Sequence, residues 1–243
     1  MSNASKSQSY RHFHFREFSR GRYLAGAIYA ASDGIITTFA IVMGATGALL
    51  ASAAVLILGA VSLLANGFSM AAGNYLGARS EVEYFNKERK RELWEIKHLS
   101  EDEKEEVRNI LLSRGVGTDL ADKFTELITS NKTLWIDFMM TEELGSAPEE
   151  NISPWKSALV TFFSFLAAGL APLAFFVVSL AFVANSHFIF FIATALSLFT
   201  VGVIRARINK LSLLRNGFEI LLVGGVAAAV AYGVGFILKS ALL

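Results

Sequence analysis

The chain of 243 residues contains no cysteine. Disulfide bonds, thiolate metal sites and thiol nucleophiles are therefore excluded. The sequence also lacks a nucleophile with a neighbouring base, a catalytic triad and a phosphate-binding loop, so we expect a protein that is not an enzyme and has no nucleic-acid partner. No apolar run precedes Tyr23 in the polar and basic segment 1–22, which therefore does not resemble a cleavable signal peptide.

Hydrophobic residues, by contrast, make up 53% of the chain, and the mean hydropathy is +0.48. Both values exceed those of an ordinary soluble domain. A helix needs about 20 apolar residues to cross a bilayer, and five segments meet that requirement: 24–44, 53–76, 155–178, 187–204 and 217–238. The sequence therefore predicts an all-α polytopic membrane protein with five transmembrane helices in the lipid bilayer.

Lysine and arginine are unevenly distributed between the segments that connect these spans. They occur in the tail 1–22, in a long insert after the second span and in the connection after the fourth, whereas the connections 45–52 and 179–186 have none. By the positive-inside rule, we expect the N-terminus and the insert to be cytosolic and the C-terminus to lie on the opposite side. The expected organisation is a cytosolic tail (1–22), two spans (23–78), a cytosolic helical domain (79–150) and three spans (151–243).

The insert is acidic, with 11 Lys/Arg and 18 Asp/Glu between residues 79 and 150. We expect three helices there, of which the first continues the second span out of the membrane. The second begins at Ser100, because Ser100 and Glu103 resemble a capping box that satisfies free backbone amides. The third runs from about Thr118, has a break near Asn131 and reaches Leu144, where Gly145 and Pro148 close it.

Glutamates in the insert recur at a spacing of three residues, which places both members of a pair on one helix face. Neighbouring carboxylates repel one another unless a cation lies between them, and oxygen ligands suit Mg, Mn, Ca and Fe(II), while a thioether favours softer first-row metals. Solvated surface glutamates and packing methionines remain the alternative interpretation. The candidate metal-binding residues are Glu92, Glu95, Glu103, Glu106, Met139, Met140 and Glu143.

Asp33 is the single charged side chain in the first predicted span. Placing an acidic side chain near the middle of a membrane helix costs roughly 2.5 to 3.5 kcal/mol on insertion scales, so such residues usually mark ion or proton routes. Asp33 therefore indicates a transporter or a channel. The alternative is that Asp33 stays hydrated near one interface or caps a helix broken at Gly34.

Four motifs in the chain, at 33–40 (DGIITTFA), 69–75 (SMAAGNY), 135–145 (WIDFMMTEELG) and 224–232 (GGVAAAVAY), resemble those of the vacuolar iron transporter family. The resemblance extends over nearly the whole chain from residue 24. It implies a homodimeric exporter that moves Fe(II), and often Mn(II), out of the cytosol in exchange for protons. The implied location is the cell inner membrane or a vacuole-type membrane.

The resemblance also implies roles for particular residues. It makes the insert a metal-binding domain whose seven candidate residues collect Fe2+ or Mn2+, with Zn2+ as an in vitro substitute. It places the transport path at Asp33 and Met70, to which Asn66 adds an amide. The chain departs from the family at Ser62 and Asn74, where glutamates are usual, and this removes two titratable groups from the path.

These departures leave other functions open. The alternative is a membrane-anchored metal-binding or sensing protein whose bundle has impaired or uncoupled transport. A ferritin-like oxidase is a weaker candidate, because its iron sites use Glu-x-x-His pairs and the one histidine of the insert, His98, is not at that spacing.

Overall fold

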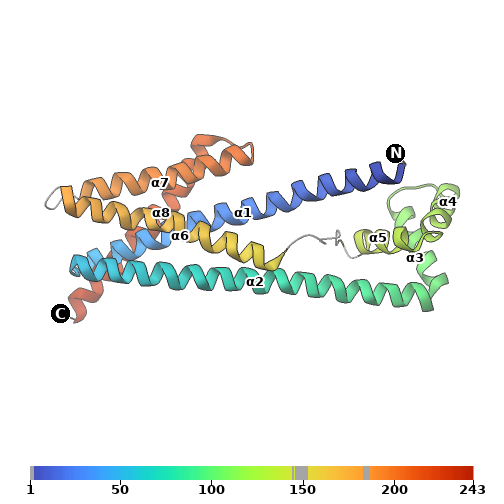
Figure 1. The fold of residues 1–243 in the computed structure, drawn as a ribbon, viewed down its shortest axis with the longest axis horizontal. Helices are drawn as coiled ribbons and strands as arrows, with labels where there is room; N and C mark the ends of the chain where they lie inside the picture. Colours follow the sequence, from blue (N-terminus) through green and yellow to red (C-terminus); the bar gives the residue numbers. More distant parts are fainter. Residues whose placement is uncertain (1–2, 144, 146–152, 183–186, 243) are drawn as a thin grey trace. The chain divides into compact units, whose positions relative to one another are not determined.

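The computed structural model describes residues 3–143, 145, 153–182 and 187–242. In these residues the chain is helical throughout, with no strand (Figure 1). The helices are α1 (Asn3–Gly47), α2 (Ser52–His98), α3 (Ser100–Ser113), α4 (Thr118–Thr129), α5 (Lys132–Glu142), α6 (Pro154–Phe182), α7 (His187–Ile208) and α8 (Leu213–Leu242).

Five helices are long and apolar enough to cross a membrane, as the hydropathy pattern predicts. The apolar part of α1 begins at Gly21, but the helix itself begins at Asn3 and so extends through most of the predicted tail. The other candidate spans lie in α2, Pro154–Leu180, Phe190–Ile208 and Leu213–Ala241. The all-α, five-span fold class is therefore confirmed.

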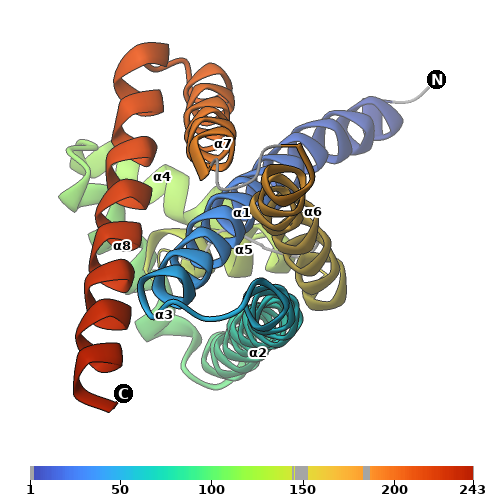
Figure 2. The ribbon, with the colours of Figure 1, turned by 90° about the vertical axis from the view of Figure 1, so that its left-hand side faces the viewer.

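The chain divides into two compact units, which we call the membrane unit (Met1–Tyr75 with Ser153–Leu243) and the insert unit (Leu76–Ile152). In the membrane unit, α1 packs against α6, α7 and α8, and α7 packs against α8 (Figure 2). Glycines permit the closest approaches. A Cβ atom at Gly34 would collide with the carbonyl oxygen of Phe165 on α6, and one at Gly235 with the carbonyl oxygen of Gly44 on α1. Small residues therefore determine how closely α1 approaches its neighbours.

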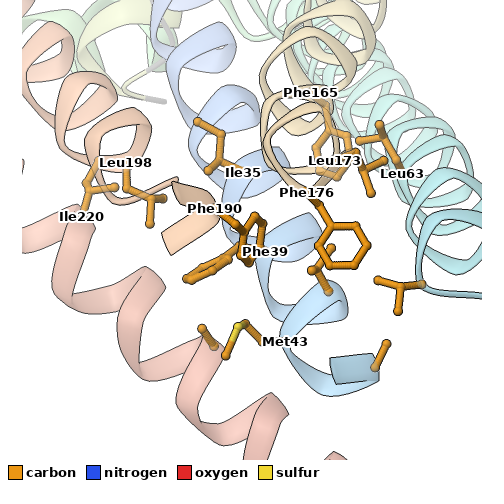
Figure 3. Packing of buried hydrophobic residues seen from close by; sticks show 14 of the residues in the cluster. Ile35, Phe39, Met43, Leu63, Phe165, Leu173, Phe176, Phe190, Leu198 and Ile220 are labelled. Carbon is orange, nitrogen blue, oxygen red and sulfur yellow. The ribbon is translucent and has the colours of Figure 1, made fainter. Parts of the chain in front are cut away.

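An aromatic cluster forms the centre of the membrane unit (Figure 3). The ring centroids of Phe39 and Phe190 are 5.5 Å apart, and those of Phe176 and Phe190 are 5.8 Å apart. Such tilted and edge-to-face pairs stabilise a core beyond the area that they bury. Leu63 of α2 belongs to the same cluster. All five helices of the membrane unit therefore contribute to one core.

The insert unit contains the polar end of α2 together with α3, α4 and α5. The predicted helix start at Ser100 is correct, but the predicted capping box is wrong. Leu99 occupies the N-cap position, and no side chain caps the helix. The backbone N–H of Glu103 already donates to the carbonyl oxygen of Leu99 at 3.0 Å, and the Glu103 side chain is buried instead of folding back.

The third predicted helix of the insert is two helices, α4 and α5, separated at the expected break. Asn131 caps α5: its Oδ1 accepts hydrogen bonds from the backbone N–H groups of Thr133 at 3.0 Å and Leu134 at 3.1 Å. A side chain that satisfies two free amides stabilises a new helix start. α5 ends at Glu142, whereas Leu144, the predicted end, and Pro148 lie outside the described residues.

Candidate metal site and transport path

Two buried carboxyl groups lie at the centre of the candidate metal site. Glu92 on α2 is 0% exposed and Glu103 on α3 is 7% exposed. Among the described residues, no donor outside the pair reaches either carboxyl oxygen of Glu92 or Glu103 Oε2. The two carboxyl groups lie within hydrogen-bond reach of each other, so one can donate to the other when it is protonated. A buried carboxylate without a partner is costly, and it either takes up a proton or binds a cation.

The buried environment of Glu92 favours the protonated form of its carboxyl group. Glu92 lies in the polar end of α2, well past the apolar segment, and burial raises the pKa of its carboxyl group to about 8. The negative charges of Glu103, Glu143 and Glu95 add to the increase. Without a cation, Glu92 is therefore mostly protonated at neutral pH.

The pKa values of two further glutamates are raised for the same reasons. Burial, followed by the charge of Glu106, raises the pKa of Glu103. The same two causes raise the pKa of Glu143, although the positive charge of Arg91 opposes them. The five glutamates predicted from spacing are thus close enough to act on one another, and their combined charge favours a cation.

Arg91 and Glu88 also belong to this cluster, although neither was predicted from the sequence. The guanidinium of Arg91 lies 2.9 Å from Glu88 Oε2, 3.4 Å from Glu95 Oε2 and 3.7 Å from Glu143 Oε1. Glu88 is buried. The available signal was the spacing of Glu88, Glu92 and Glu95, which places all three on one face of α2.

Arg91 therefore neutralises part of the negative charge of Glu95 and Glu143. As arranged, no group of three or more Asp, Glu or His side chains could hold a metal ion within the part of the chain that the structure describes. A metal ion bound at Glu95 and Glu143 would have to displace Arg91 from them.

The two candidate methionines lie in the hydrophobic core of the insert unit. Met139 is 0% exposed and Met140 is 2% exposed, and both pack in a cluster with Ile96 and Val107. Ile96 follows Glu92 by one helical turn and Val107 follows Glu103 by one turn. The two methionines thus pack against α2 and α3 one helical turn beyond the buried carboxyl groups.

In the membrane unit, Asp33 is half-buried on α1. Its Oδ1 accepts a long hydrogen bond of 3.4 Å from Thr37 Oγ1, one turn further along the same helix. The next residue, Gly34, lies at the close contact with α6. The backbone contact therefore fixes the position of Asp33, while the carboxylate itself is only weakly engaged.

The four other candidate path residues, Ser62, Asn66, Met70 and Asn74, recur at every fourth position and form one half-buried stripe along α2. Asn66 Nδ2 donates to Ser62 Oγ at 3.0 Å. This is the single hydrogen bond within the candidate path set among the described residues. No polar contact joins Asp33 to the stripe in that part of the chain.

Ser157 on α6 is a polar partner of Asn74 that was not predicted from the sequence. Its hydroxyl donates to Asn74 Oδ1 at 2.6 Å. Beside it, the rings of Tyr75 and Trp155 meet edge to face with centroids 5.6 Å apart. These contacts join α2 to α6 at the end of the membrane unit from which the insert departs. They also occupy the amide oxygen of Asn74.

Comparisons with known proteins agree over most of the chain. The model of the VIT family matches residues 24–236. A protein of Plasmodium berghei (strain Anka) named vacuolar iron transporter is 30% identical over 226 residues, which cover 90% of this chain and 83% of that protein. A protein of the same name from Toxoplasma gondii (strain ATCC 50861 / VEG) is 33% identical over 225 residues, covering 89% and 74%. Vacuolar iron transporter 1 of Oryza sativa subsp. japonica is 30% identical over 233 residues, covering 95% and 92%.

Proposed function

The chain belongs to the VIT family, and from this membership we propose that it transports divalent metal ions across a membrane, with Fe(II) as substrate and Mn(II) as a second substrate. Its five apolar helices make it a multi-pass membrane protein. We propose that the insert is cytosolic, that the chain works as a homodimer, and that metal leaves the cytosol in exchange for protons.

The observation that carries the proposal is the buried pair Glu92 and Glu103, whose carboxyl groups lie within hydrogen-bond reach of each other. No other donor among the described residues reaches either oxygen of Glu92 or Glu103 Oε2. A fold that served only stability would not retain such groups without compensation. A divalent cation provides that compensation, because it stabilises the ionised form of each carboxyl group that it contacts. Carboxylate oxygens suit hard divalent cations such as Mn(II).

Binding in the insert unit involves two exchanges. The metal displaces a proton from Glu92, whose pKa is raised to about 8, and it displaces Arg91 from Glu95 and Glu143. Both exchanges weaken net affinity. A site that loads a transporter requires such moderation, because it must also release the ion.

In the membrane unit, Asp33 is the single titratable side chain among the five candidate path residues. We propose that Asp33 alternates between metal and proton, while Met70, Asn66, Asn74 and Ser62 supply neutral donors. A carboxylate that faces a path within a membrane is suited to this exchange.

Transport is tested with purified full-length protein in liposomes that contain a fluorescent divalent-metal indicator. We expect metal-dependent fluorescence change with Fe(II) under reducing conditions and with Mn(II), and loss of most of the flux in Asp33→Asn. The matched control is Asp119→Asn, which removes an exposed carboxylate of α4 and should leave the flux unchanged.

Proton exchange is measured in the same vesicles with a pH indicator. Proton movement opposite to metal movement, lost together with it in Asp33→Asn, is the expected result. Metal flux without proton movement would contradict the exchange and leave transport itself intact. Absence of flux for both metals would refute the transport proposal.

The second candidate function is a membrane-anchored metal-binding or sensing protein, and the observation that favours it is the neutral stripe on α2. Ser62 and Asn66 bond to each other, and Asn74 bonds to Ser157, so these groups are engaged within the chain. Tight Mn(II) binding to the full chain, without flux in vesicles, would favour the anchor over the transporter.

A further inference from the structure

A cavity of about 330 Å³ lies between α1, α7 and α8 of the membrane unit, three helices that pack against one another (Figure 2). Its wall combines apolar side chains, among them Ile28, Ile36 and Val223, with the polar groups of Arg205, Asn209 and Glu219. The volume lies at the lower end of the range for small-molecule sites.

The charged groups of this cavity lie at one end of the membrane spans. Arg205 is close to the end of the span Phe190–Ile208, and Glu219 is close to the start of the span Leu213–Ala241. The cavity therefore has a charged part at the boundary between membrane and water and an apolar part beside the spans. This division of chemistry matches an amphipathic molecule with a charged head and a hydrocarbon chain.

Arg205 is only loosely engaged by the protein. Its Nη1 lies 3.8 Å from Glu219 Oε1, which is beyond hydrogen-bond length. Among the described residues, no other acidic side chain pairs with it. A guanidinium carries five N–H donors in a planar fork that suits the oxygens of a phosphate group. Most of these donors remain available for a ligand.

The surrounding charge has the sign that an anionic ligand requires. The segment from Arg205 to Glu219 also contains Arg207, Lys210 and Arg215. It therefore carries four positive charges and one negative charge. Lys210 has a φ of 54°, in a position after the end of α7 where glycine is the usual residue. The turn nevertheless carries a lysine, one of these four cations, directly after Asn209, which lines the cavity.

We propose that this cavity binds one anionic glycerophospholipid per chain, with the phosphate at Arg205 and part of one acyl chain along Ile28, Ile36 and Val223. Basic pockets between membrane helices are suited to such headgroups. The site depends on membrane insertion and is independent of the transport proposal.

Native mass spectrometry of the detergent-purified full chain tests the site. Phosphatidylglycerol and phosphatidylcholine with identical acyl chains are supplied as probes. We expect one retained phosphatidylglycerol per chain, and about tenfold weaker retention in Arg205→Ala. The control Arg207→Ala removes the same charge from the same helix at a residue that does not line the cavity, and we expect less than about a twofold change.

A second pair of variants leaves every charge in place. Val223→Trp fills the cavity and should lower phosphatidylglycerol retention, whereas Val226→Trp, on an exposed part of α8 outside the cavity, should not. This pair keeps the test decisive if Arg205→Ala fails to fold.

Three results would overturn the proposal. Equal losses in Arg205→Ala and Arg207→Ala would indicate diffuse attraction by the basic segment. Equal retention of the two lipids would show that the headgroup is not recognised. Displacement of the lipid by millimolar glycerol phosphate would assign the site to a soluble phosphate compound.

Discussion

Replacing Glu92 by glutamine tests whether the buried carboxyl pair is a cation site. In an ordinary glutamate the pKa is 4.5, whereas in the folded chain the pKa of Glu92 is raised to about 8. At pH 7 about nine tenths of Glu92 is therefore protonated, and ionising it costs about 1.4 kcal/mol per pH unit below 8. Metal binding must overcome this cost, so we expect the apparent affinity for Mn(II) to fall about tenfold per pH unit between 8 and 6.

Isothermal titration calorimetry of the full chain, in two buffers with different ionisation enthalpies, measures the protons that Mn(II) releases. We expect about one proton per metal ion at pH 7 from Glu92 in the natural chain, and fewer in Glu92→Gln. Loss of a charge-assisted ligand contact of about 1.5 to 3 kcal/mol should weaken binding by about tenfold to a hundredfold.

Glu92 also makes the stability of the metal-free chain depend on pH. Because the folded state holds the proton of Glu92 more tightly than the unfolded state, the free energy of unfolding falls as the pH rises from about 4.5 to 8. Glu92→Gln removes this dependence, so its melting temperature should fall less over that window.

The control is Glu126→Gln, on an exposed position of α4, which should match the natural chain in both measurements. If Glu92→Gln binds Mn(II) with unchanged affinity and releases the same number of protons, the buried pair is not the metal site. The insert would then not load metal through Glu92.

Three further substitutions test contacts that shape the two units. Gly34→Ala places a Cβ atom against the α6 backbone and should destabilise the protein by about 1 to 3 kcal/mol in a thermal melt, whereas Gly26→Ala meets no atom within 4 Å and should not. Ser157→Ala removes the 2.6 Å hydrogen bond to Asn74 and should cost about 1 kcal/mol while altering metal flux; an unchanged flux would place Asn74 outside the path. Asn131→Ala removes the cap of α5 and should lower stability by about 1 kcal/mol, seen as faster amide exchange at the start of α5.

The membrane spans were predictable from sequence because the bilayer imposes a length on any apolar helix. The break at Asn131 was also predictable, because an asparagine side chain offers an oxygen to free amides over a distance of two or three residues. Both signals are local. Neither depends on contacts between residues that are far apart in the sequence.

The errors and omissions arise from contacts between distant residues. The capping box at Ser100 was wrong because the Glu103 carboxyl is drawn into a buried cluster with Glu92, and local spacing does not record that competition. Ser157 was missed because its partner, Asn74, is separated from it by the whole insert. Arg91 was missed because the sequence around it contains several cations and nothing distinguishes this one from the others. Its partner Glu143 is distant in the sequence and reaches it only in the folded chain.

Charge balance leads to a last prediction about the homodimer. A divalent ion carries two positive charges, and each chain offers one carboxylate to the proposed path, at Asp33. Leaving one charge unbalanced at membrane depth is costly, so in the proposed homodimer the Asp33 side chains of both chains share one ion. Dimers that combine a natural chain with an Asp33→Asn chain, isolated through two different affinity tags, should then transport as little as dimers with both chains substituted. Half of the natural flux would show instead that each chain holds its own path and that the neutral donors of α2 suffice to complete it.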